Sequence, residues 1–217
     1  MSLPAGEWTE LLDWKRRIFA MYARIRTAAD PVEAWADFRA TRDVMFREHP
    51  QSPIPVDERR DLELPYFDYN PAARVLAEIA PAEETHYEIA TSGNSTYGFT
   101  RIAEASFELE TEQQKLELYW LDGYGGGLFV PYRDATAGTE TYGAGRYLFD
   151  TIKGADLGMQ EGRIVFDFNF AFNPSCAYDP RWVCPLAPPP NRLTIPIRAG
   201  EKHLAQPDRG KHLVQSD

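Results

Sequence analysis

The residues best suited to chemistry include the only two cysteines of this 217-residue chain. Cys176 and Cys184 are separated by seven residues within the proline-rich stretch NPSCAYDPRWVCPLAPPPNR, residues 173–192. A cysteine acts as a nucleophile when a base lies within hydrogen-bond reach, and Cys176, which shortly precedes Tyr178 and Asp179, is the better candidate. The pair could also close a short disulfide, whereas a reducing cytoplasm favours two buried free thiols.

A zinc site is the weaker interpretation of these cysteines. Two thiolates supply half of a tetrahedral set, and the four histidines form no HxH or HExxH pattern. We therefore expect no metal and no other cofactor.

Two carboxylates and one arginine form a second candidate group. The Arg146 guanidinium could clamp a carboxylate or phosphate, because it donates two parallel hydrogen bonds. Glu140 and Asp167 would be general acid and base if burial separates their pKa values. This site requires the hairpin around residues 139–147 to lie beside the segment RIVFDFNFAF, residues 163–172.

The segment 163–172 alternates with the period of a strand. Its phenylalanines would share one face, and Asp167 and Asn169 would lie on the other. The polar face either meets water or points into the mouth of a barrel, where its groups must be paired or bind something. The candidate ligand-binding residues are Tyr142, Arg146, Asn169, Asn173, Tyr178 and Asn191.

The elements that would position these residues follow from periodicity. Apolar residues at helical spacing predict two N-terminal helices, the second capped by Asp30 and Pro31 and stopped by QSPIP. Later runs alternate with a period of two and are punctuated by glycine-rich turns. We expect a mainly β, α+β fold, in which seven to nine antiparallel strands form a barrel or sandwich with the helices packed on it. The expected units are a helical pair (1–50), a β-barrel-like domain (51–202) and a polar C-terminal tail (203–217).

Charge and hydropathy limit the partners. The net charge is −10, and residues 61–160 carry 17 acidic and six basic residues. Such a surface repels phosphate backbones, so nucleic acid and anionic membranes are excluded. The sequence shows no secretory signal and no apolar stretch long enough to span a bilayer. We therefore expect a cytoplasmic protein, with a homodimer through the exposed helical face possible.

The stretches TAGTETYGAGRYLFD and FDFNFAFNPSCAYDPRWVCPLAPPPNRL, together with the upstream HPQSPIP, resemble the bacterial and archaeal domain of unknown function 1684 family. The resemblance runs from about Phe46 to Lys202. It implies no established activity. It implies that a set of positions belongs together: Glu140, Tyr142, Gly143, Gly145, Arg146, Tyr147, Asp167, Asn169, Asn173, Cys176, Tyr178, Cys184 and Asn191.

Three functional interpretations remain open from the sequence. The first is a barrel that binds a small polar or anionic molecule in a mouth roofed by the proline-rich loop. The second is a hydrolase-like enzyme that uses Glu140 and Asp167, or Cys176, in the same pocket. The third is a structural or interaction domain without a ligand, in which Asn173 and Asn191 cap loop backbone and Arg146 is a buried hydrogen-bond hub.

Overall fold

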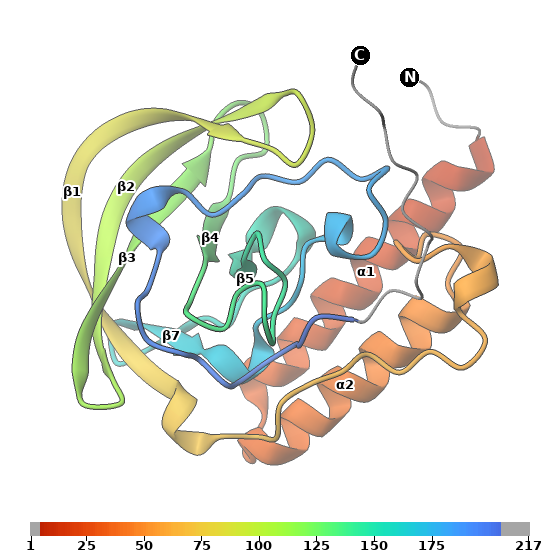
Figure 1. Ribbon diagram of the computed structural model, residues 1–217, viewed down its shortest axis with the longest axis horizontal. Coiled ribbons are helices and arrows are strands. Elements are labelled where there is room, and N and C mark those ends of the chain that lie inside the picture. Colours follow the sequence, from red (N-terminus) through yellow and green to blue (C-terminus); the bar gives the residue numbers. More distant parts are fainter. Residues whose placement is uncertain (1–4, 205–217) are drawn as a thin grey trace.

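The computed structural model describes residues 5–204, which begin with two helices that pack side by side. Helix α1 spans Ala5–Thr27 and helix α2 spans Pro31–Glu48. Figure 1 shows both helices, red and orange, on one side of a strongly curved sheet. The predicted helical pair is therefore confirmed.

The start of α2 follows the predicted capping pattern. The Asp30 carboxylate accepts hydrogen bonds from the backbone N–H groups of Val32 and Glu33, and Pro31 occupies the first turn. These N–H groups have no partner within the helix, so the cap supplies one, and proline needs none. The local sequence thus fixes where the chain reverses between the two helices.

One antiparallel sheet follows the two helices, with its strands in the order β5-β4-β3-β2-β1-β7-β6. The first five strands pair consecutively along the chain, and β7 pairs with the other edge of β1. A mainly β, α+β fold is thereby confirmed. The strands are Arg74–Ala90 (β1), Thr96–Leu109 (β2), Glu112–Leu121 (β3), Leu128–Tyr132 (β4), Arg146–Asp150 (β5), Met159–Gln160 (β6) and Arg163–Asp167 (β7).

No continuous ladder closes the sheet within residues 5–204. Tyr147 of β5 and Phe172 exchange two backbone hydrogen bonds of 2.9 and 3.1 Å, which form one isolated bridge. This bridge joins β5 to the chain that follows β7 and a short 3-10 turn, η4 (Phe168–Phe170). The terms barrel and sandwich therefore describe the sheet only loosely.

The core lies between the helices and the concave face of the sheet. Phe38 of α2 meets Phe170 edge to face at 5.2 Å, and Phe107 of β2 contacts Phe166 at 5.3 Å and Phe168 at 5.8 Å between ring centroids. All five rings are at most 4 % exposed. Burying each ring contributes about 1.5–3 kcal/mol, so this aromatic layer is a major source of attachment between the two parts.

The predicted strand over 163–172 ends earlier than expected. The Asp167 carboxylate accepts a hydrogen bond from the backbone N–H of Asn169, which turns the chain into η4. The expected alternation of an apolar and a polar face therefore stops at Asp167. Both polar side chains are buried, at 2 % and 0 % exposure, so neither faces water.

A buried ion pair fastens α2 to the far end of the described chain. Arg42 donates from Nη2 to Glu201 Oε2 at 2.7 Å and from Nε to the Tyr66 hydroxyl at 2.7 Å. The Tyr178 hydroxyl donates to Glu201 Oε1, and the Asn173 backbone N–H donates to Oε2 at 3.0 Å. Arg42 is 4 % exposed and Glu201 is fully buried, so each charge depends on these partners.

The segment that carries Glu201 reaches α2 by a long path. After the 3-10 turn η5 (Ser175–Ala177), the chain crosses the front of the sheet, passes through η6 (Pro189–Asn191) and ends close to α2, drawn in blue in Figure 1. The expected polar tail, 203–217, lies outside the described residues from 205 onward.

Glu201→Gln is expected to lower the free energy of unfolding by about 3–5 kcal/mol, because Arg42 would stay buried without a counter-charge. The measurement is urea denaturation monitored by tryptophan fluorescence. The matched control is Glu140→Gln, which removes an exposed ion pair with Arg198 and should change stability by less than about 1 kcal/mol. Equal effects of the two substitutions would contradict the role given to Glu201.

Candidate functional site

The Arg146 side chain is enclosed by protein and only 1 % exposed. Its Nη2 donates to Asp134 Oδ2 at 2.8 Å and to the carbonyl of Ile197 at 2.9 Å. Its Nη1 donates to the carbonyls of Ala199 and Glu201 at 2.5 and 3.2 Å. Both terminal nitrogens are thus occupied by the chain itself, which favours a hub that holds residues 197–201 over a clamp for a ligand.

Glu140 and Tyr142 lie on the same hairpin as Arg146, but each contacts a different residue and neither contacts Arg146. Glu140 lies at the surface and accepts two hydrogen bonds from Arg198 Nε, at 3.0 and 3.1 Å. The Tyr142 hydroxyl donates to Cys176 Sγ at 3.7 Å, and its ring stacks on His203. The hairpin therefore presents its polar groups in different directions.

The glycine at position 145 explains part of the hairpin motif. Gly145 has a φ of +102°, in the region that favours glycine, and an added Cβ would lie 2.4 Å from the carbonyl oxygen of Tyr132. A side chain at this position would separate the hairpin from β4. The close approach places Arg146 beside its carbonyl partners.

Asp167 and Asn169 face a different part of the molecule from the hairpin. The Asn169 amide donates from Nδ2 to the carbonyl of Asn70 and accepts from the Asn70 N–H at Oδ1, both at 2.8 Å. Asp167 lines a groove of about 510 Å³ beside the turn between α1 and α2. Its second oxygen is 3.8 Å from Arg74 Nε. Burial raises the pKa of Asp167 to about 6, against the opposing effects of hydrogen bonds from Asn169 and the charge of Arg74.

Asn191 joins three segments from a fully buried position. Its Oδ1 accepts from the N–H of Glu117 at 2.8 Å, and its Nδ2 donates to the carbonyls of Glu117 and Pro131 at 3.0 and 2.7 Å. The Asn191 side chain thus makes the hydrogen bonds that a neighbouring strand would otherwise make to the backbone of Glu117 in β3 and Pro131 in β4. It serves the attachment of the proline-rich loop to the sheet.

The candidate residues thus form separate groups. Asn173 and Tyr178 meet at Glu201, and Tyr142 meets Cys176. Pockets identified among the described residues do not bring Glu140, Arg146 and Asp167 together. The shared hollow expected between the hairpin and the segment 163–172 is therefore not formed by these three side chains.

Another pocket, called the enclosed pocket below because most of its lining residues are buried, lies between the helical pair, the end of β5 and the chain that follows η4. Its cavity volume is about 80 Å³, enough for several water molecules or a few heavy atoms of a ligand. Of the expected ligand-binding residues, Asn173 lines it. Its apolar walls are made by Trp14, Ile18, Phe46, Tyr147, Phe172 and Pro174.

The polar groups of this enclosed pocket include several that the protein does not fully satisfy. Arg42 uses Nε and Nη2, while Nη1 makes no hydrogen bond with the residues that the structure describes. Within the same residues, the Tyr22 hydroxyl and Asn173 Oδ1 are buried without a partner. Burial also raises the pKa of Tyr22, so the hydroxyl stays protonated and able to donate. Unpaired buried polar atoms are rare because each is costly.

Sequence reasoning missed Tyr22 and Arg42, although one signal was present. Arg42 stands four residues after Phe38 and four before Phe46, in the middle of the apolar stripe of α2. A charged residue at such a position must find a buried partner or line a cavity. The partner, Glu201, carries no comparable local signal.

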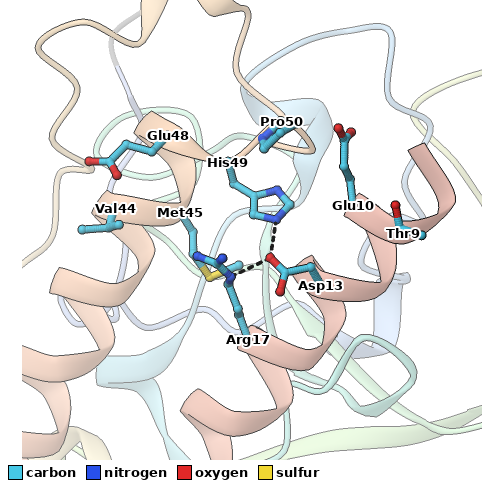
Figure 2. Close-up of a pocket in the computed structure, with 9 residues that line it drawn as sticks. All are labelled: Thr9, Glu10, Asp13, Arg17, Val44, Met45, Glu48, His49 and Pro50. Carbon is cyan, nitrogen blue, oxygen red and sulfur yellow. Dashed lines mark hydrogen bonds and ion pairs between the residues drawn. The ribbon is translucent and has the colours of Figure 1, made fainter. Parts of the chain in front are cut away.

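The groove between the two helices, shown in Figure 2, has paired polar groups. Asp13 Oδ2 lies 2.7 Å from Arg17 Nε and 3.1 Å from His49 Nε2. The Nδ1 atom of His49 accepts a hydrogen bond from the Gln51 N–H at 3.0 Å, so Nε2 carries the ring proton. The hydrogen bond from His49 lowers the pKa of Asp13. With both ring nitrogens engaged, His49 fastens the end of α2 to α1.

A family model described as protein of unknown function (DUF1684) matches residues 62–202. The chain belongs to this family. Among solved structures it is similar to the solution NMR structure of an uncharacterised protein from gene locus rrnAC0354 of Haloarcula marismortui. That pair has 38 % sequence identity and a TM-score of 0.56, covering 76 % of this chain and 89 % of that chain. No curated protein matches.

Membership of the DUF1684 family confirms the relationship that the motifs indicated. The matched region includes Asn173, Tyr178 and Glu201, whereas Tyr22 and Arg42 lie N-terminal to it. The enclosed pocket is therefore built jointly by the family region and by the helical pair that precedes it.

Residues 5–204 contain neither a membrane-spanning helix nor a cluster of metal ligands. No helix there is long and apolar enough to cross a bilayer. Nor does that part of the chain gather three or more His, Cys, Asp or Glu side chains in an arrangement that could hold a metal ion.

Asp167→Asn should change how stability depends on pH. The folded protein holds the Asp167 proton more tightly than the unfolded chain, whose pKa is about 3.9, so this group lowers wild-type stability as pH rises through about 6. The variant is expected to gain about 2–3 kcal/mol relative to wild type between about pH 4 and about pH 7. The measurement is urea denaturation at a series of pH values.

The matched control for this pH series is Asp37→Asn, which changes an exposed carboxylate on α2. The difference between the two variants isolates the effect of burial at Asp167. Parallel stability curves for Asp167→Asn and wild type across this pH range would contradict the raised pKa.

Proposed function

We propose that this protein binds a small molecule that carries an oxygen acceptor, such as a carboxylate, on a compact apolar body. The binding site is the enclosed pocket between α1, α2 and residues 172–175. The observation that carries the proposal is that two buried polar atoms without a partner among the described residues, the Tyr22 hydroxyl and Asn173 Oδ1, belong to residues that line this pocket together with Arg42.

The hydrogen-bonding capacity of these groups defines the polar end of the ligand. Arg42 Nη1 and the Tyr22 hydroxyl are donors, so they suit an acceptor, and a guanidinium binds a carboxylate with a charge-assisted hydrogen bond. Asn173 Oδ1 is an acceptor and suits a hydroxyl or N–H group on the same molecule. A small hydroxy acid, or a small acid that carries an amide N–H, meets both requirements.

The charges near the pocket limit the ligand to at most a low negative charge. Glu201 compensates Arg42, and Asp150 Oδ2 lies 3.2 Å from Lys153 Nζ, so the four charges cancel. A polyanion would find no excess positive charge to offset its desolvation. The aromatic walls instead favour an apolar body of modest size.

The third interpretation of the sequence, a structural role, is supported at residues outside this pocket. The terminal nitrogens of Arg146 and the amides of Asn169 and Asn191 make hydrogen bonds to the chain itself, and these residues act as attachments between segments. We assign these residues to scaffold stability and Asn173 to ligand contact. Tyr178 positions Glu201 and, through it, Arg42.

The test is a thermal-shift screen of aliphatic and hydroxylated carboxylates small enough for a pocket of about 80 Å³, with their amides for comparison. A ligand at about 100 times its Kd should raise stability by about 2.7 kcal/mol. Tyr22→Phe should weaken the binding of a hit about tenfold, by loss of one hydrogen bond. In the free protein the same change should be neutral or stabilise by about 1 kcal/mol, because it removes an unpaired buried hydroxyl.

Tyr132→Phe is the matched control. Tyr132 is also fully buried, but its hydroxyl lies beside Arg146 and it does not line the enclosed pocket. This variant should leave the affinity for the same ligand unchanged. No shift across the panel, or equal losses of affinity in both variants, would overturn the proposal.

A further inference from the structure

A groove of about 510 Å³ lies between the α1–α2 turn and strands β6 and β7, and we call it the Asp167 groove. It has no lining residue in common with the enclosed pocket. Its polar lining includes the side chains of Asp167 and Arg74. Its apolar walls are made by Ile25, Pro31, Ala34, Leu157, Val165 and Phe170. Apolar walls with a few polar groups gathered at one place are the usual form of a small-molecule site.

The two oxygen atoms of the Asp167 carboxylate have different surroundings. Oδ1 accepts two hydrogen bonds from Asn169, one from the backbone N–H at 3.1 Å and one from Nδ2 at 2.9 Å. Oδ2 makes no hydrogen bond within residues 5–204, and Arg74 Nε is 3.8 Å from it, which is too far for one. Asp167 is 2 % exposed and lines the groove, so the groove gives a ligand access to Oδ2.

The turn at Asp167 needs neither the second oxygen nor the charge. The cap on η4 uses Oδ1 alone, and an asparagine side chain supplies such an oxygen equally well. Burial penalises the ionised form and raises the pKa of Asp167 to about 6, although the hydrogen bonds from Asn169 and the charge of Arg74 oppose this. A charged side chain that costs stability, and whose second oxygen makes no hydrogen bond to the fold, is expected where a ligand binds.

Arg74 offers a hydrogen-bond donor beside this acceptor. Its Nη2 donates to Gln160 Oε1 at 2.9 Å, whereas its Nε makes no hydrogen bond within the described part of the chain. The charges of Arg74 and Asp167 cancel. Arg26, which also lines the groove, is compensated by Asp156, because its Nη1 lies 3.5 Å from Asp156 Oδ2 and donates to the Asp156 carbonyl at 2.7 Å. These four charges therefore leave no excess of either sign.

We propose that the Asp167 groove binds a neutral molecule that carries a carboxamide or a lactam on an apolar body. The N–H group of the ligand donates to Asp167 Oδ2, and its carbonyl accepts from Arg74 Nε. An amide carries this donor and this acceptor on one carbon, so a single group bridges the two side chains. A carboxylate would instead bring a second negative charge to Asp167, and an ammonium group a second positive charge to Arg74. The groove and the enclosed pocket are separate sites, so either proposal can fail alone.

The experiment is a titration of the full chain at neutral pH, monitored by backbone amide NMR shifts, with benzamide and isobutyramide as probes. At least one probe should bind with a dissociation constant of about 1 mM or below. Its N,N-dimethyl derivative keeps the carbonyl but has no N–H, so it should bind at least about tenfold more weakly. No saturable binding of either primary amide at millimolar concentration, or equal affinities for an amide and its dimethyl derivative, would overturn the proposal.

Asp167→Asn tests the acceptor, because the amide NH₂ that replaces Oδ2 presents a donor to the donor of the ligand. This variant removes a destabilising buried charge, so it should fold, and it should bind the amide at least about tenfold more weakly than wild type. Asp37→Asn changes an exposed carboxylate on α2 and is the matched control, which should leave the affinity unchanged. Tyr22→Phe, in the enclosed pocket, should also leave it unchanged. Equal affinities of Asp167→Asn and wild type would refute the site.

The affinity for the amide should also depend on pH. The ligand N–H requires the ionised carboxylate, which about one tenth of the molecules carry at about pH 5 and nearly all carry at about pH 7.5. The affinity should therefore rise about tenfold between these pH values. Arg74 stays charged throughout, and Tyr69, whose pKa is raised by burial and by Asp167, stays neutral, so the change reports on Asp167. An affinity that does not change with pH would contradict the contact with Oδ2.

Discussion

The structure depends on a single buried carboxylate. Glu201 accepts hydrogen bonds from Arg42 of α2, from the Tyr178 hydroxyl and from the Asn173 backbone, and its own carbonyl accepts from Arg146. Helices, sheet and proline-rich loop therefore meet at one residue. Removing two opposite charges from water is costly, and here the cost is offset because each carboxylate oxygen has partners. The same arrangement holds the Arg42 guanidinium at the edge of the enclosed pocket.

Local patterns were sufficient to predict the two helices and the long strands, although not the turn that ends β7 at Asp167. The apolar stripe of residues 8–25, and the cap formed by Asp30 and Pro31, depend only on neighbours a few positions away. The same is true of the alternation within β2 and β3. The pairing of β7 with β1 could not be predicted in this way, because ladder partners such as Arg74 and Asp167 are far apart in the sequence.

The candidate residues were recognised by type, but their contacts were not. The positions of Asp167 and Asn169 in the sequence are compatible with a strand whose polar face is exposed or points into a barrel. In the structure the chain turns there, and both side chains make hydrogen bonds to backbone groups. Alternation cannot reveal such a substitution, since it records polarity and not hydrogen bonding. Likewise, an arginine with five donors suits a ligand clamp as well as a hub, and only the carbonyls brought to Arg146 by residues 197–201 decide between them.

The path of the chain has a consequence for the order of events during synthesis. Arg42 leaves the ribosome early, while its counter-charge at Glu201 follows 159 residues later. Until that carboxylate arrives, docking α2 against the sheet would bury a cation without its partner, and closing so long a loop adds an entropic cost. Stable docking of α2 is therefore expected only after residue 201 has emerged, so the apolar stripe of α2 stays exposed for most of synthesis.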